Sequence, residues 1–110
     1  MSYKLYFETN DSIFNEFIKL IASLNESMDH VMILFNKDGM RIHRETEENF
    51  ILCAAWDRLH IFNKYICPNN IKLIVNLAEF YNNLITLKGS TGYKWLISDD
   101  DDDNLYIYKS

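Results

Sequence analysis

Residues 62–87 read FNKYICPNNIKLIVNLAEFYNNLITL and hold the clearest structural signals in this chain of 110 residues. A short extended piece is followed by a turn at Pro68-Asn69-Asn70 and by the apolar run Ile71–Val75, which predicts a buried strand. Asn76 predicts a helix start, because an Asn side chain accepts hydrogen bonds from the first backbone N–H groups of a helix. We therefore expect a strand that leads directly into a helix from about Leu77 to Leu87.

Both predicted helices have one apolar face at helical spacing. The first, Ile13–Leu24, follows the capping residues Asn10-Asp11-Ser12 and the predicted strand Tyr3–Glu8. Its core-facing side chains are Ile13, Phe17, Leu20, Ile21 and Leu24, widened by Phe14 and Ile18. Those of the second helix are Leu77, Phe80, Leu84 and Leu87. The chain thus resembles two copies of a strand–helix–strands unit.

The remaining segments alternate with the period of two that is typical of strands. Between the helices we predict a hairpin turn at Asn36–Gly39, polar or turn segments at Thr46–Asn49 and Asp57–Ile61, and strands at Asp29–Phe35, Met40–Glu45, Phe50–Trp56, Phe62–Ile66 and Ile71–Val75. After the loop Gly89–Gly92 we predict strands at Tyr93–Ser98 and Leu105–Lys109, joined by a solvated acidic loop, Asp99–Asp103. The order β-α-β-β-β-β-β-α-β-β predicts an α+β fold, an antiparallel sheet with two helices on one face.

The strand patterns also predict which side chains are buried. Met40 and Ile42 are expected to face the core, with Arg41 and His43 on the opposite face. Phe50–Trp56 is apolar enough to predict that it is covered on both faces at one end. The aromatic residues expected in the core, and not as base-stacking platforms, are Phe14, Phe17, Phe50, Trp56 and Trp95. Cys53 and Cys67 are expected to be buried free thiols.

Composition and charge limit the classes of function. The length predicts one domain, and 48% hydrophobic with 25% charged residues is ordinary for a soluble protein. The sequence has no signal-peptide pattern and no apolar run long enough for a membrane span, so we expect an intracellular protein with no membrane partner. A net charge of −5 argues against nonspecific nucleic-acid binding by the domain as a whole, without excluding a local basic face.

Residues 62–77 carry a family resemblance. Phe62-Asn63-Lys64-Tyr65-Ile66-Cys67 is an aromatic-x-x-Tyr-x-Cys segment, and Val75-Asn76-Leu77 opens a helix after the next strand. With the same spacing, this pattern resembles the N-terminal domain of the eukaryotic and archaeal sliding clamps, the PCNA family. Ser12-Ile13, Gly39 and the acidic loop also fit, and the comparison needs no gaps from about Gly39 to Ser110.

The resemblance implies a DNA-clamp fold and a function. Residues 1–110 are then expected to be one clamp-like domain, the N-terminal half of a two-domain subunit. Such subunits self-associate into a ring around duplex DNA and tether DNA polymerase and other clamp-binding proteins during replication and repair. The resemblance implies no enzyme activity and no cofactor, and a location in the nucleus or at a viral replication site.

The resemblance also implies site residues. Helix residues expected to face DNA are Asn15, Lys19, Ser23, Asn82 and Lys88. Asn49 and Leu52 match positions beside the partner-binding pocket. Clamps usually carry Lys where this chain has Asn15, Glu16, Asn82 and Ile85. Because each missing phosphate contact weakens binding, we expect this domain alone to hold duplex DNA poorly. An alternative is a clamp-fold interaction module without a DNA channel, such as a checkpoint-clamp-like or viral replication or transcription adaptor.

Other clusters of polar residues favour ordinary surface roles. Asp99–Asp103 lacks the Gly and terminal Glu of an EF-hand loop. His30, His43 and His60 lie on different predicted elements, so no metal site is expected. Arg41, His43 and Arg44 form either a mixed-charge surface or a phosphate-touching patch. Gly89–Gly92 lacks the Lys of a phosphate loop, and no nucleophile has a base near it in the sequence.

Overall fold

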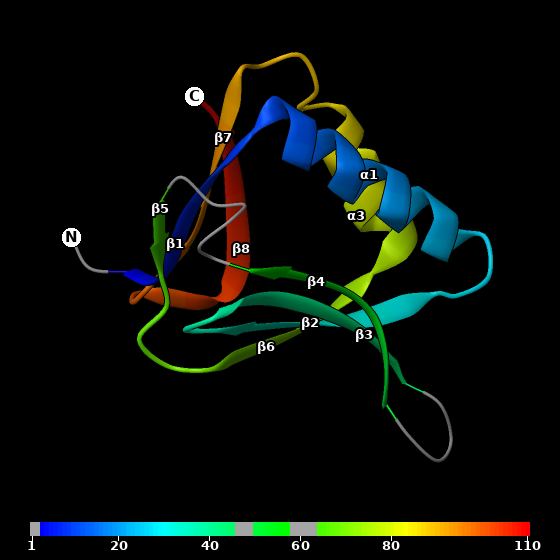
Figure 1. Ribbon diagram of the computed structural model, residues 1–110, viewed down its shortest axis with the longest axis horizontal. Coiled ribbons are helices and arrows are strands. Elements are labelled where there is room, and N and C mark those ends of the chain that lie inside the picture. The colour runs from blue at the N-terminus through cyan, green and yellow to red at the C-terminus, as the bar shows by residue number, and fades with distance from the viewer. Residues whose placement is uncertain (1–2, 46–49, 58–63) are drawn as a thin grey trace.

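The computed structural model describes residues 3–45, 50–57 and 64–110. Figure 1 shows two sheets that meet at an angle, with two helices closing the third side. In chain order the elements are β1 (Tyr3–Asn10), α1 (Asp11–Asn25), β2 (His30–Asn36), β3 (Gly39–Glu45), β4 (Phe50–Asp57), β5 (Lys64–Ile66), β6 (Ile71–Asn76), α3 (Leu77–Ile85), β7 (Gly92–Ser98) and β8 (Asp101–Lys109). The predicted α+β class and element order are confirmed.

Within the described residues, eight strands form two antiparallel sheets of four strands each, and not one continuous sheet. Sheet A has the order β5-β1-β7-β8, and sheet B has the order β4-β3-β2-β6. In each sheet we call the face that packs on the helices inner and the opposite face outer. Each sheet therefore has two edge strands, β5 and β8 in sheet A and β4 and β6 in sheet B.

Both helices begin at an Asn cap at the end of a strand, as the sequence predicts. The Asn10 side chain accepts a hydrogen bond from the Ile13 N–H at 2.8 Å, and that of Asn76 from the Glu79 N–H at 3.0 Å. α3 ends at Ile85, two residues before the predicted end, and its C-cap Thr86 donates its hydroxyl to the Asn83 carbonyl at 2.7 Å. The helices lie side by side and run in opposite directions (Figure 1).

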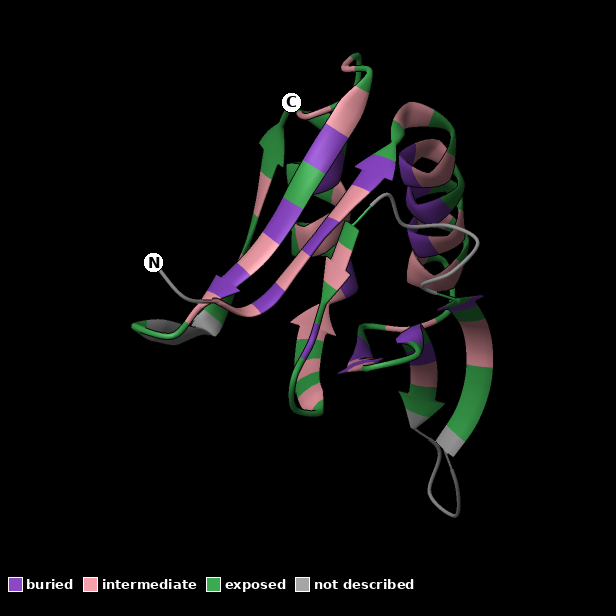
Figure 2. Cartoon of the chain, turned by 60° about the vertical axis from the view of Figure 1, so that its left-hand side comes forward, coloured by how far each residue is buried: buried purple, intermediate pink, exposed green. Residues whose placement is uncertain are grey.

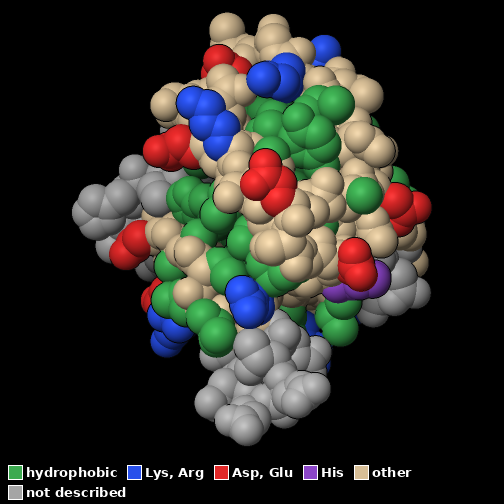
Figure 3. Space-filling view, turned by 90° about the vertical axis from the view of Figure 1, so that its right-hand side faces the viewer, with side chains coloured by type: hydrophobic (Ala, Val, Ile, Leu, Met, Phe, Trp, Pro, Cys, Tyr) green, Lys and Arg blue, Asp and Glu red, His purple; other side chains and the backbone are tan. Residues whose placement is uncertain are grey.

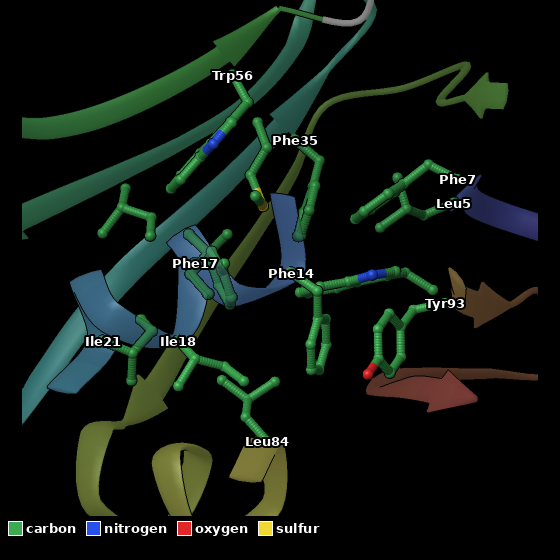
Figure 4. Close-up of a cluster of buried hydrophobic side chains, with 14 of the residues drawn as sticks. Leu5, Phe7, Phe14, Phe17, Ile18, Ile21, Phe35, Trp56, Leu84 and Tyr93 are labelled. Carbon is green, nitrogen blue, oxygen red and sulfur yellow. The ribbon is translucent and has the colours of Figure 1, made fainter. Parts of the chain in front are cut away.

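Aromatic side chains dominate the core between the sheets and the helices (Figure 4). The Phe17 ring is 5.1 Å from that of Trp95, 5.5 Å from Trp56 and 5.7 Å from Phe80, centroid to centroid, all edge to face. Phe17 thereby joins sheet A, sheet B and α3. Trp95 donates its indole N–H to the Thr9 hydroxyl at 3.1 Å, and Thr9 is 2% exposed. Phe14, Phe17, Trp56 and Trp95 are buried as predicted.

Tyr65 of the aromatic-x-x-Tyr-x-Cys segment links the two sheets. It stands on β5 in sheet A, and its hydroxyl lies 2.7 Å from the Asn36 carbonyl and 2.8 Å from the Gly39 carbonyl, at the β2–β3 turn of sheet B. Cys67 is buried and its thiol donates to the Asn69 carbonyl at 3.1 Å, whereas Cys53 is only half-buried. The segment that carries the family resemblance therefore has a structural role.

Two expectations about individual segments are wrong. β4 is not covered on both faces at one end, because it is an edge strand whose Ile51 and Leu52 are 48% and 53% exposed. The acidic run is not a five-residue loop, because β8 already begins at Asp101, which pairs with Ser98. Only Asp99 and Asp100 form the turn, where the Ser98 hydroxyl accepts the Asp100 N–H at 3.2 Å.

The β2–β3 hairpin follows the prediction closely. The Asn36 side chain accepts the N–H groups of Asp38 at 2.8 Å and Gly39 at 3.1 Å, and Gly39 has a positive φ of 145°. Met40 and Ile42 are buried, and Arg41 is exposed on the other face. The predicted connection Thr46–Asn49 and most of the segment Asp57–Ile61 lie outside the described residues. No helix within the described ranges is long and apolar enough to cross a membrane.

Candidate nucleic-acid interface

The surface that the sequence predicts to meet DNA is the helix layer, formed by α1 and α3. The helices bury Phe14, Phe17, Ile18 and Ile21 of α1 and Leu77 and Leu84 of α3 toward the sheets. Their other sides form one surface, because the two helices lie against each other. Phe80 of α3 packs on Phe17 of α1 across this contact.

Of the residues predicted to face DNA, Asn15, Lys19 and Ser23 lie on α1, Asn82 lies on α3, and Lys88 follows the end of α3. Lys19, Ser23, Asn82 and Lys88 are exposed, and Asn15 is half-buried. Ile85, at a position where clamps usually carry a basic residue, is 39% exposed. Among these predicted residues, Lys19 and Lys88 carry positive charge.

The charge on the helix layer does not favour the binding of a polyanion such as DNA. The helices carry the acidic residues Asp11, Glu16 and Glu79 and the single lysine Lys19, and just beyond their ends lie Glu26 after α1 and Lys88 after α3. Figure 3 views the side on which the helices lie, and its blue and red groups are scattered singly among hydrophobic and neutral surface. Phosphate binding needs cations that displace counterions, so the charge of this layer gives little support for tight binding of duplex DNA.

Leu52, one of the two residues predicted to lie beside a partner-binding pocket, belongs to β4 of sheet B. Asn49 lies outside the described residues. Leu52 is exposed on the outer face of β4, opposite His43 of β3. The strand register places His43 opposite Met32 of β2, and Met32 opposite Ile74 of β6. A mostly apolar row therefore crosses all four strands, and the buried Nε2 of His43 in this row has no hydrogen-bond partner among the residues that the structure describes.

The predicted cluster of Arg41, His43 and Arg44 is divided between two faces. Arg41 and His43 share the outer face of sheet B, opposite Leu34 and Met32, whereas Arg44 alternates to the other face, opposite Ile51. A single phosphate-touching patch of all three side chains is therefore wrong. His30 is exposed at the start of β2, and His60 lies outside the described residues. Among the described residues no group of three His, Cys, Asp or Glu side chains could hold a metal ion.

Exposed hydrophobic residues gather on the edge strands, which the sequence analysis did not anticipate. Six of the seven large hydrophobic residues found exposed in the described part of the chain lie on edge strands; they are Ile51 and Leu52 of β4, Ile66 of β5, Ile74 of β6, and Tyr106 and Tyr108 of β8. Ile74 is 67% exposed. An edge strand presents backbone groups that can pair with another strand, and apolar side chains there favour association.

The outer face of sheet A carries a hydrogen-bonded pair, Tyr6 and Glu8, with Lys64 beside it. Tyr6 donates its hydroxyl to the Glu8 carboxylate, two residues along β1, and the Lys64 ammonium lies 5.5 Å from the centroid of the Tyr6 ring. The hydrogen bond to Glu8, with smaller contributions from burial and from the negative charges, raises the pKa of Tyr6 to about 12. The alternation that creates this face is visible along the strands in Figure 2.

Comparisons with known proteins identify the fold. No family model matches the sequence, and no curated protein sequence matches it. Among solved structures, the chain is similar to the DNA polymerase III beta chain of Streptococcus pneumoniae TIGR4, with a TM-score of 0.63 and 10% sequence identity over 99% of this chain. The chain covers 31% of that bacterial chain. At this identity the likeness shows the fold alone, and the sheets and helices of this chain have a clamp-like arrangement.

Proposed function

We propose that this chain is a sliding-clamp domain of the PCNA type, which acts as a processivity factor and scaffold in DNA replication and repair by encircling duplex DNA in a ring. The observation that carries the proposal is the arrangement of layers. Two capped helices run in opposite directions on one side, and two sheets with four edge strands form the rest. The clamp-like fold shared with the polymerase III beta chain supports it.

In this role the domain performs no chemistry and acts through its surfaces. The exposed apolar residues Ile51 of β4 and Ile74 of β6, on the edge strands of sheet B, suit self-association into a ring by strand pairing. The outer face of sheet B, where Leu52 is exposed, suits the docking of DNA polymerase and other clamp-binding proteins. The proposed function places the protein in the nucleus or at a viral replication site.

Encirclement explains how a helix layer with few cations could still serve DNA. A closed ring is held by topology, so its retention does not need strong phosphate contacts. The test is to load the protein on nicked circular DNA, wash in high salt to remove contacts that depend on charge, and then cut half of the sample with a restriction enzyme. Retention on circles and loss after cutting support the proposal. Equal behaviour of cut and uncut DNA contradicts it.

A second function, favoured by the excess of acidic residues on the helix layer, is a clamp-fold interaction module without a DNA channel. It would join other proteins in a checkpoint-clamp-like or viral replication or transcription complex. Binding to duplex DNA as a function of salt separates the two. The module predicts a slope of log affinity against log salt near zero, and a slope of several units contradicts it, since each phosphate contact contributes about 0.9.

A further inference from the structure

Sheet A has an outer face that no part of the proposed ring function uses. The strand register aligns two rows across its four strands. The first row is Ile66, Tyr6, Leu96 and Tyr106. The second is Lys64, Glu8, Lys94 and Tyr108. The two rows are adjacent, because on each strand the residue of the second row is two positions away from the residue of the first row.

Aromatic rings are presented on this face. Tyr106 and Tyr108 are 38% and 51% exposed, and their ring planes are 14° from parallel with centroids 6.4 Å apart. Tyr3 and Tyr6 form a second pair, with centroids 5.4 Å apart. Exposed tyrosine rings on a four-stranded sheet are a surface on which unpaired bases can stack, because every base has a π-face.

Positive charge lies beside the rings. Lys64 and Lys94 are exposed and flank Glu8 in the second row, and Lys64 covers the ring of Tyr6. The Glu8 carboxylate accepts the Tyr6 hydroxyl, which offsets part of its charge. The acidic run Asp99–Asp103, which forms the turn and the start of β8, lies at the far end of the β7–β8 hairpin, nearer to Tyr106 than to Tyr108. Phosphates are therefore best placed along the second row, between Lys64 and Tyr108.

We infer that the outer face of sheet A binds single-stranded DNA, with bases stacked on the rings of Tyr108 and Tyr106 and phosphates held by Lys64 and Lys94. Charge complementarity carries the assignment, because the cations stand beside exposed rings here, whereas acidic residues outnumber lysines on the helix layer. The choice of DNA over RNA rests on the proposed function. The domain would then hold an unpaired strand outside the ring while the duplex passes through it.

The test is fluorescence anisotropy of a short labelled oligo(dT), with the matching duplex and oligo(U) as further probes. Tyr108→Ala is expected to weaken oligo(dT) binding about 5- to 150-fold, the value of one stacked base. Tyr108→Phe is expected to retain the affinity, because stacking uses the ring and not the hydroxyl. Lys64→Gln and Lys94→Gln, made as separate variants, should each lower the salt slope by about 0.7, and Lys37→Gln in the β2–β3 turn is the charge-matched control.

Three results would overturn the inference. One is the absence of oligo(dT) binding at low salt, and another is equal binding by the wild type and Tyr108→Ala. The third is tighter binding of oligo(U) or duplex than of oligo(dT). Tyr108 is half exposed, so its replacement should leave the fold intact, which circular dichroism checks. Duplex encirclement is measured separately on circular DNA, so either proposal can fail while the other stands.

Discussion

At the scale of single residues, polar side chains with specific partners determine how the strands and helices fit together. Thr9 is the one polar residue found buried in the described part of the chain, and its hydroxyl receives the indole N–H of Trp95. Asn10 and Asn76 start the two helices. A buried donor left without an acceptor costs about 1–3 kcal/mol, so such residues contribute more to stability than their size suggests.

Replacing Thr9 by Val tests this contribution. The change keeps the shape of the side chain but leaves the Trp95 N–H unpaired inside sheet A, so we expect the free energy of unfolding to fall by about 1–3 kcal/mol. Urea denaturation followed by Trp fluorescence measures it. Thr9→Ser retains a hydroxyl and should lose less than Thr9→Val. The same loss in both variants would show that the hydrogen bond contributes nothing.

The Tyr6–Glu8 pair predicts a dependence on pH. The pKa of Tyr6 is raised from 10.0 to about 12, chiefly because its hydroxyl is hydrogen-bonded to Glu8. A raised pKa in the folded state means that protonated Tyr6 stabilises the fold below about pH 10, and that this stabilisation is lost as the pH rises toward 12. Tyrosinate absorbance, compared between wild type and Tyr6→Phe, isolates this titration. Glu8→Gln should move it to lower pH, and an unchanged midpoint would contradict the assignment.

At the scale of elements, much of the fold follows from local sequence. Asn caps, apolar faces at helical spacing and period-two alternation predict both helices and the strands, because neighbouring residues determine these features. The pairing of strands into two sheets does not follow, because it depends on contacts between distant segments such as Tyr65 with Asn36 and Gly39. The acidic run was misassigned for the same reason, since pairing with β7 draws Asp101 into β8.

The candidate sites, like the fold, could be predicted only where they depend on residues that are neighbours in the sequence. The residues expected to face DNA lie on α1, on α3 or just after α3, and all of them except Asn15 are exposed. The sequence did not predict the exposed apolar edge strands or the exposed tyrosine rings on sheet A, because the exposure of a strand residue depends on which strands lie beside it. The alternation of Tyr106 and Tyr108 was the available signal, but it could not distinguish an outer face from an inner one.

The link between the sheets offers a prediction at this scale. Tyr65→Phe keeps the ring that stacks on Phe7 at 5.6 Å but removes the hydroxyl that reaches two carbonyls of the β2–β3 turn. We expect a loss of about 1–2 kcal/mol in the free energy of unfolding. Hydrogen exchange should show faster exchange in the β2–β3 hairpin of sheet B. Unchanged exchange there would mean that the hydroxyl does not hold the sheets together.

At the scale of the whole molecule, charge and exposed apolar surface are distributed unequally. The net charge is −5, and the helix layer contains one lysine, Lys19, with Lys88 just beyond the end of α3. Placing Lys at an exposed position of that layer should therefore change DNA binding measurably. Asn82→Lys adds one phosphate contact if α3 faces the duplex, so the slope of log affinity against log salt should steepen by about 0.9. Thr91→Lys, in the loop after α3, is the control with the same charge. Equal slopes for both variants would contradict a duplex-facing α3.

The central claim is that edge strands assemble this clamp-like domain into a closed ring. The most direct measurement is the mass of the protein in solution by sedimentation equilibrium over a range of concentrations. The account predicts a single oligomer of fixed stoichiometry at high concentration, and its loss in Ile74→Lys, whose side chain is too exposed in the monomer to affect folding. Thr91→Lys should assemble like the wild type. A monomer at every concentration, or a mass that grows without limit, would contradict the account.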